Sequence, residues 1–593
     1  MDGGTETGHS LKRERLRDIL TRLLPALDWA KGYQRETLAS DLLAAVIVTI
    51  MLIPQSLAYA LLAGLPAEMG LYASILPLVA YAFFGTSRTL SVGPVAVASL
   101  MTATAVGNVA ASGTADYASA AIALALLSGL MLLLLGFLRF GFMANFLSHP
   151  VVSGFITASG IIIALSQLRH ILGINAHGDT LPELTASLFA DMGAFNTTTL
   201  VVGAAATAFL FWSRVLLAPL LHRLGFTASA ASILAKTGPV LVILATIVAS
   251  FVGDFEARGV ALVGAVPQGL PAFSVPNFGF ELWSELAVSA LLISMIGFVE
   301  SVSVGKTLAA KRRQRIDPNQ ELVGLGVANV ASAISGGFPV TGGFSRSIVN
   351  FDAGAQTQAA SIFTAVGIAL AALLLTPVLF YLPKATLAAT IIVAVTSLVD
   401  FKILRTAWAY SRSDFFAVTV TIVATLLFGV ELGVLAGIFS SLALHLHKSV
   451  QPHIAVIGAV PGTEHYRNIY RHKVITHPNI VSLRIDESLY FANASYLESC
   501  IYSLIASETE LEHVILQCTA VNEIDLSALE ALEAINYRLN ELNLSLNLSE
   551  VKGPVMDALK RTDFLAHLSG EVFLSHHQAV EKLKPDIIEP YII

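Results

Sequence analysis

An arginine lies in an apolar part of this sequence, shortly after a pair of glycines. In the stretch 341–347, Gly342 and Gly343 interrupt the apolar pattern, and a new helical pattern begins just before Arg346. A charge at the centre of a membrane-spanning helix costs about 3 kcal/mol or more, so it normally faces a partner or a water-filled cavity. A helix that begins at membrane depth directs free N–H groups and the positive end of its dipole toward whatever occupies that cavity. The stretch therefore predicts an anion site; the alternative is a re-entrant loop buried in protein, with Arg346 bonded to backbone carbonyls.

A second interrupted segment has the same form. Gly93 and Pro94 precede a short apolar stretch, and proline is favoured in the first turn of a helix. If the apolar segments form two equal repeats, the interrupted segments occupy equivalent positions, the third and the tenth. Paired broken helices at matching positions in two halves indicate the midplane site of a secondary transporter. The backbone N–H groups expected to bind an oxyanion are those at the two helix starts: Val95, Ala96, Phe344 and Ser345.

Three further polar side chains lie inside apolar segments. Gln55 and Tyr59 are four residues apart, so they share one face of a helix and are expected to donate hydrogen bonds to the substrate; ordinary helix packing is the alternative. Glu300 lies well inside the eighth apolar segment. Burial favours its neutral form and a nearby cation favours its charged form. We expect a Glu300–Arg346 pair in which protonation of Glu300 frees Arg346 to attract a dianion; the alternative is a static ion pair between two helices.

The composition is that of an integral membrane protein. Of the 593 residues, 55% are hydrophobic and 13% are charged, against about 25% charged in an average soluble chain. The net charge of −7 gives no indication of nucleic-acid binding. The chain has two cysteines, and its histidines show no metal-ligand spacing, so we expect neither a metal nor another cofactor. Because no nucleotide-binding motif is present, we expect secondary transport and not an enzyme.

The hydropathy pattern predicts the elements that position these residues. We expect a cytoplasmic N-terminal segment at 1–40, a transmembrane transport domain at 41–450 and a cytoplasmic α/β domain at 451–593. Apolar residues at helical spacing over 16–24 predict a short amphipathic helix on the membrane surface, with a spacer as the alternative. Basic residues fall in alternate loops, and the stretch 173–213 contains none. Both termini are therefore expected to be cytoplasmic, in a multi-pass protein of a cell inner membrane.

The transmembrane part contains about fourteen apolar segments, several of them too short to cross about 30 Å of hydrocarbon alone. Among the basic residues between segments, Arg88, Arg139 and Arg214 are assigned to loops. The expected spans are 41–64, 70–85, 92–108, 116–138, 146–172, 198–221, 237–253, 286–305, 321–337, 344–352, 358–382, 384–400, 413–429 and 431–448.

Six transmembrane stretches stand out as motifs: 53–60 (IPQSLAYA), 64–66 (GLP), 70–72 (GLY), 85–88 (GTSR), 91–96 (SVGPVA) and 337–350 (GFPVTGGFSRSIVN). In this order and spacing they resemble motifs of the SulP (sulfate permease) family of anion transporters. The C-terminal part resembles the STAS domain that such transporters carry, with Asp525-Leu526-Ser527 at the position of its short Asp-x-Ser element.

The resemblance implies an α-helical membrane protein built from two inverted repeats, with a core domain that moves against a gate domain. It implies an anion between the N-termini of the third and tenth helices, and a homodimer. Together with Glu300 it favours proton-coupled sulfate symport. The alternatives are a bicarbonate or dicarboxylate transporter or exchanger, an anion channel or voltage-responsive motor, and a membrane-anchored signalling protein whose output is the C-terminal domain.

Overall fold

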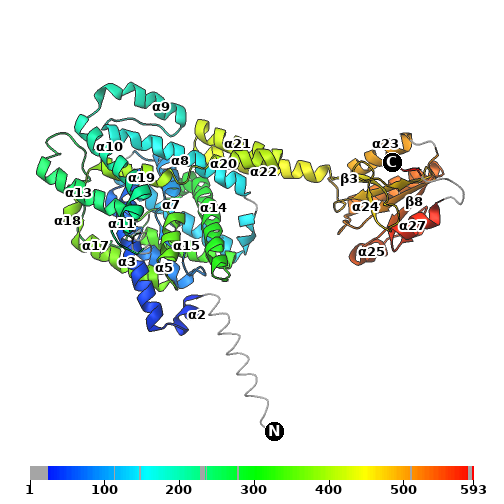
Figure 1. The fold of residues 1–593 in the computed structure, drawn as a ribbon, viewed down its shortest axis with the longest axis horizontal. Coiled ribbons are helices and arrows are strands. Elements are labelled where there is room, and N and C mark those ends of the chain that lie inside the picture. The colour runs from blue at the N-terminus through cyan, green and yellow to red at the C-terminus, as the bar shows by residue number, and fades with distance from the viewer. Residues whose placement is uncertain are drawn as a thin grey trace, which may run out of the picture. The chain divides into compact units, whose positions relative to one another are not determined.

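The computed structural model describes residues 24–111, 114–145, 148–227, 231, 234–235, 237–274, 276, 279–507, 510–584 and 591–592. The chain divides into two compact units, 1–441 and 442–593 (Figure 1). The surface helix predicted over residues 16–24 lies outside the described part, apart from Leu24.

The first unit is almost entirely helical (Figure 1). Its elements are α2 (Ala26–Lys31), α3 (Arg35–Leu62), α4 (Ala67–Tyr72), α5 (Leu76–Phe84), β1 (Val92–Gly93), α6 (Ala96–Gly107), α7 (Ala115–Phe137), η1 (Phe140–Asn145), α8 (His149–Leu172), α9 (Leu181–Ala190), η2 (Met192–Ala194), α10 (Thr197–Trp212), η3 (Ser213–Leu217), α11 (Ala218–Arg223), α13 (Gly238–Gly253), α14 (Phe280–Lys311), α15 (Pro318–Ile334), β2 (Thr341–Gly342), α16 (Phe344–Asp352), α17 (Ala359–Leu374), α18 (Thr376–Leu379), α19 (Lys384–Val395), α20 (Lys402–Tyr410), α21 (Arg412–Phe428) and α22 (Val430–Val450).

Every stretch predicted to be a span contains a helix, or consecutive short helices such as α4 with α5. Among the described residues, seven helices are long and apolar enough to cross a membrane, and four more are apolar but shorter. α16 has nine residues, which is roughly 14 Å of helix. Because this is about half the hydrocarbon thickness, α16 reaches only part of the way across, as its interrupted sequence predicted.

Helix packing separates two groups within the first unit. One group, here called the core group, contains α3, α5, α7, α14, α15 and α17, which enclose α6 and α16. The other, the gate group, contains α8, α10, α13, α19 and α21 with the elements that continue α10, namely η3 and α11. The groups meet where α13 and α19 contact α3, and where α6 contacts α8.

The second unit is a mixed sheet with helices, as predicted for the C-terminal part. The sheet order is β10-β5-β3-β6-β7-β8-β9, and β6 to β9 run parallel, joined by helical crossovers. Its strands are β3 (Ile454–Ala459), β4 (Tyr466–Asn468), β5 (Ile475–Thr476), β6 (Ile480–Ile485), β7 (His513–Gln517), β8 (Ser545–Ser549), β9 (Val572–Phe573) and β10 (Tyr591–Ile592). Its helices are α23 (Ala494–Ser507), α24 (Leu526–Glu541), α25 (Gly553–Leu559), α26 (Phe564–His567) and α27 (His576–Leu583).

Candidate functional site

The two interrupted segments meet at a short pair of strands. β1 pairs with β2 in antiparallel fashion, with Val92 opposite Gly342 and Gly93 opposite Thr341. α6 follows β1 after two residues and α16 follows β2 after Gly343. The strand pair therefore brings the N-termini of the two half-helices together, although their sequences lie in different halves of the chain.

Both helix starts leave backbone donors without intrahelical partners. The first intrahelical bonds run from Ser99 N to Val95 O at 2.9 Å and from Ser347 N to Gly343 O at 3.0 Å. At neither helix start does an N-cap side chain accept a hydrogen bond from a backbone N–H of the first turn. In the described part of the chain, the N–H groups of residues 96–98 and 344–346 have no intrahelical partner and can donate to a ligand, whereas Gly343 N donates to Ser91 O at 3.1 Å. The prediction that Pro94 lies in the first helical turn is wrong: α6 begins at Ala96, because the preceding residues are held extended by pairing with β2.

Side chains satisfy the irregular backbone around the strand pair. Ser347 Oγ donates to Gly343 O at 2.7 Å and accepts from Ser91 N at 3.0 Å, which ties α16 to the segment before β1. Asn329 Nδ2 donates to Val340 O at 2.8 Å, and Val340 N donates to Asn329 Oδ1 at 2.9 Å. Non-helical backbone at membrane depth requires such internal partners, so the strand pair is a built element of the core group.

A buried carboxylate fixes the loop that leads into β1. Glu321 at the start of α15 is fully buried, at 0% exposure. It accepts hydrogen bonds from Thr86 N at 2.7 Å, Ser87 N at 3.0 Å and Tyr81 OH at 2.6 Å. Charge-assisted bonds of this kind are among the stronger ones in proteins. Sequence reasoning missed Glu321, because an acid at the start of a predicted span is usually solvated.

The guanidinium of Arg346 lies against the strand pair. The residue is 2% exposed, and among the described residues neither Nη1 nor Nη2 has a hydrogen-bond partner. A methyl group placed on Gly93 would lie 3.0 Å from Nη1, and one on Gly343 would lie 2.8 Å from Nε. Buried donors without partners cost several kcal/mol, so this position is suited to accepting anionic oxygens beside the two helix starts. Backbone carbonyls do not satisfy these two nitrogens, contrary to the alternative considered from sequence.

Glu300 and Tyr59 both interact electrostatically with Arg346. The expected direct Glu300–Arg346 pair is wrong for this structure, because in the described residues no nitrogen of Arg346 lies within 4.0 Å of the Glu300 carboxylate. The physical reason is direction: the arginine side chain extends back to Gly93 of β1 and to Gly343, the N-cap of α16, whereas Glu300 lines a cavity.

Two cavities lie beside the first turn of α16, and each is lined by residues of both helix groups. The first, of about 370 Å³, is lined by Gln55 and Ser345 on the core side and by Arg214 on the gate side. The second, of about 200 Å³, is lined by Glu300 and Phe344 on the core side. Ser397, which follows α19, lines both cavities. Four of the predicted site residues therefore line the two spaces, whereas Tyr59, Val95, Ala96 and Arg346 line neither of them.

Among the lining residues that sequence reasoning missed are His149, Arg214 and Ser397. The assignment of Arg214 to a loop is wrong, because α10 continues through the π-helix η3 into α11 and Arg214 lies within this continuous helix. The span expected from hydropathy, 198–221, does include Arg214; only the assignment of basic residues to loops misplaces it. His149 and Ser397 carry no signal that distinguishes them from residues at ordinary helix ends.

A comparison with protein families matches residues 38–421 to the "Sulfate permease family" and residues 472–579 to the "STAS domain". "Sulfate transporter 4.1, chloroplastic" of Arabidopsis thaliana is 37% identical over 586 residues, which cover 96% of this chain and 84% of that protein. The two matched families follow one another in the order that the two structural units have.

Two solved structures share the fold. The murine solute carrier 26 family member A9 anion transporter, in an inward-facing state, aligns with a TM-score of 0.85 at 24% identity and covers 94% of each chain. The transmembrane domain of a cyanobacterium bicarbonate transporter, BicA, aligns with a TM-score of 0.58 at 20% identity, over 69% of this chain and 98% of that one. At these identities the likeness concerns the fold alone.

Proposed function

The chain belongs to the sulfate permease family, and from this premise we propose that it carries sulfate by proton symport, with alternating access to a site between the N-termini of α6 and α16. Membership makes it an integral, multi-pass membrane transporter of anions and not an enzyme. The observation that carries the sulfate site is the buried guanidinium of Arg346, whose Nη1 and Nη2 have no partner among the described residues.

The proposed anion contacts come from three sources. Backbone N–H groups at the helix starts add dipole ends without adding a full charge. Arg346 supplies a full charge, and Gln55 reaches the same cavity as Ser345. Tyr59, which is buried and in electrostatic contact with Arg346, completes the set. The helix-start donors are those of Val95, Ala96, Phe344 and Ser345.

The proposed coupling group is Glu300. It lines the second cavity, which His149 also lines, so a proton has a route to Glu300 that differs from the Gln55 side of α16. When Glu300 is charged, it opposes the field of Arg346 at the anion site; when it is protonated, that opposition is removed. Proton and dianion therefore bind cooperatively, which is what symport requires. This differs from the pairing expected from sequence, since no direct contact between the two side chains is needed.

Radiolabelled sulfate uptake into proteoliposomes tests the proposal, with and without an inward proton gradient and with bicarbonate and fumarate as competitors. We expect saturable uptake that the gradient stimulates. Uptake of bicarbonate or fumarate in place of sulfate would overturn the sulfate assignment and favour the second candidate, a bicarbonate or dicarboxylate carrier. The specific reason to keep that candidate is the fold shared with a bicarbonate transporter, since helix-end recognition does not distinguish tetrahedral from planar anions.

The remaining expectations are part of the same proposal. We assign transport to residues 41–450 and a cytoplasmic STAS domain to 451–593, with 1–40 as a cytoplasmic N-terminal segment. The alternation of basic loops supports cytoplasmic termini, the compact loops are the reason for proposing a cell inner membrane, and the family resemblance supports a homodimer. Cysteine accessibility from the two sides of sealed vesicles, and cross-linking in membranes, test these two assignments.

A further inference from the structure

Arg214 is a charged residue in a cavity where the proposed anion donors otherwise come from the core group. It lies on η3 of the gate group and lines the first cavity opposite Gln55 and Ser345. Of the described residues that line this cavity, Arg214 alone carries a charge. A cation in a cleft whose walls are otherwise uncharged raises the local concentration of anions.

The gate-side hydroxyls of this cavity are already used as donors. Ser213 Oγ donates to Leu210 O at 2.9 Å, and Thr390 Oγ1 donates to Leu387 O at 2.7 Å. Ser397 Oγ likewise donates to Ala394 O, near the end of α19, at 2.6 Å. Each of these hydroxyl groups has one hydrogen to donate, so none of them is left to donate to an anion.

Arg214 retains donors that these hydroxyls lack. Its Nη1 donates to Val393 O near the end of α19 at 2.9 Å, which uses one of the five N–H donors of a guanidinium. The side chain is exposed, and it forms no ion pair with an acid in the described part of the chain. The π-helical turn that carries it is a feature often found at functional sites.

We propose that Arg214 is the gate-side anion contact of the first cavity and that it favours divalent over monovalent anions. The inference rests on the proposed carriage of an anion through this cavity. A dianion beside α16 has one full positive charge from Arg346 and partial charges of about +0.5 from each helix end. Arg214 supplies the second full charge from the opposite wall. A monoanion gains less from that charge, because the Coulomb energy scales with the charge on the ligand.

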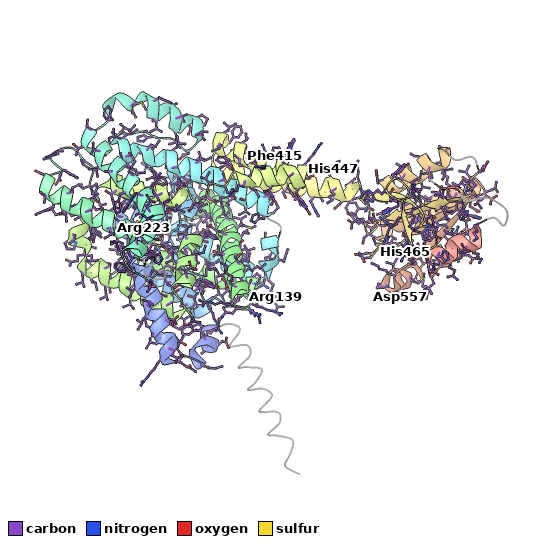
Figure 2. The ribbon with its side chains drawn as sticks, in the orientation of Figure 1. Arg139, Arg223, Phe415, His447, His465 and Asp557 are labelled. Carbon is purple, nitrogen blue, oxygen red and sulfur yellow. The ribbon has the colours of Figure 1, made fainter. Side chains whose placement is uncertain are left out.

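Uptake kinetics in proteoliposomes test the inference with Arg214→Gln, Arg214→Lys and the control Arg223→Gln. Arg223 is an exposed arginine at the end of α11 (Figure 2) and does not line the cavity. We expect Arg214→Gln to raise KM for sulfate about tenfold with a maximal rate within about twofold of wild type, which is the signature of lost uniform binding. KM for a monovalent anion should rise less than about threefold. Arg214→Lys should be intermediate, and Arg223→Gln should behave as wild type.

A purely structural role for Arg214, as a cap on the end of α19, has a different signature. It would lower the maximal rate or the melting temperature of Arg214→Gln to the same extent for every anion and leave the ratio of divalent to monovalent KM unchanged; that result overturns the inference. If wild type transports another anion in place of sulfate, the proposed substrate is wrong, and inhibition of that uptake by divalent and monovalent anions then tests Arg214 separately. If no divalent anion is carried or competes, Arg214 has no such role.

Discussion

Replacing Glu300 with Gln tests the coupling directly, because the change removes the negative charge while keeping the shape of the side chain. Glu300 and Arg346 interact electrostatically but form no ion pair within 4.0 Å. At an effective dielectric constant of about 20, unit charges at about 4 Å interact by about 4 kcal/mol, and at about 8 Å by about 2 kcal/mol. An anion about 8 Å from the charged Glu300 carboxylate is repelled by about 2 kcal/mol per unit of its own charge.

This energy sets the expected size of the pH effect. About 2 kcal/mol corresponds to a change in affinity of about 30-fold, so protonation of Glu300 should strengthen sulfate binding by at least that factor. In Glu300→Gln, binding should be as tight at pH 8 as wild-type binding is at acidic pH, and it should no longer depend on pH. The reciprocal effect of sulfate on proton binding is lost with it, so an inward proton gradient should no longer drive uptake.

The assay is sulfate binding and counterflow in proteoliposomes from about pH 5.5 to pH 8, with Glu431→Gln as the matched control. Glu431 accepts a hydrogen bond from Ser289 Oγ at 2.5 Å and lines neither cavity, so its replacement should leave the pH dependence intact. Wild-type pH dependence in Glu300→Gln would refute the reasoning. Loss of sulfate binding at every pH would also refute it, since the carboxyl group would then be part of the anion site.

Three further predictions concern residues that position the site and the stability of the second unit. Gly343→Ala should lower sulfate affinity at least tenfold without unfolding the protein, because its methyl group would lie 2.8 Å from Arg346 Nε. The control Gly107→Ala, whose methyl group would meet no atom within 4 Å, should have no effect. Wild-type affinity in Gly343→Ala would contradict the proposed guanidinium position. Glu321→Gln should destabilise the protein by about 3 kcal/mol, since a charge-assisted acceptor is lost, measured as a lower melting temperature; an unchanged melting temperature would argue against the anchoring role. Burial lowers the pKa of His576 to about 4, so between about pH 6.5 and pH 4 the unfolded state binds a proton that the folded state does not. The stability of the second unit should therefore fall by about 3 kcal/mol as the pH drops through this window. Hydrogen exchange of β6 to β8 measures this fall, and His576→Gln should show a smaller pH dependence.

The sequence predicted the broken helices because a glycine pair or a glycine–proline pair inside an apolar segment is a local signal. Gly93 and Gly343 could be recognised in this way, and Arg346 was conspicuous as a charge beside one of them. The strand pair between β1 and β2 could not be predicted, because each strand has two residues and no periodicity marks so short a strand. Its partners are also far apart along the chain, and pairing at such separation leaves no trace in either segment alone.

The cavity linings were harder to predict than the helices, for reasons of geometry. The assignment of basic residues to loops misplaces Arg214, although the span 198–221 expected from hydropathy contains it and the helix continues through it. The distance between Glu300 and Arg346 depends on the direction in which an arginine side chain extends, which is decided by the space that Gly93 and Gly343 leave open. Sequence spacing correctly indicated that Gln55 and Tyr59 share a helix, but only Gln55 lines a cavity.

In the proposed alternating access, the hydrogen bonds around the site indicate which parts would move together. Ser347 joins α16 to the segment before β1, and Asn350 Nδ2 donates to Thr89 O at 3.0 Å. Together with the bonds to Glu321, these contacts connect both half-helices to the rest of the core group. No such network needs to break when the core group moves against the gate group, so the helix N-termini and Arg346 can travel as one body.

The gate side supplies the contacts that change during such a movement. Arg214 and Ser397 line the first cavity from elements that belong to or follow the gate group, and His149 lines the second cavity from the start of α8. Displacement of the core group would carry Ser345 and Glu300 away from these residues while the Arg346 site stayed intact. Affinity would then be set mainly within the core group, whereas selectivity and proton access would depend on which gate residues face it. In that arrangement a substitution at Arg214 changes which anions are captured, and a substitution at Glu300 changes what drives their transport.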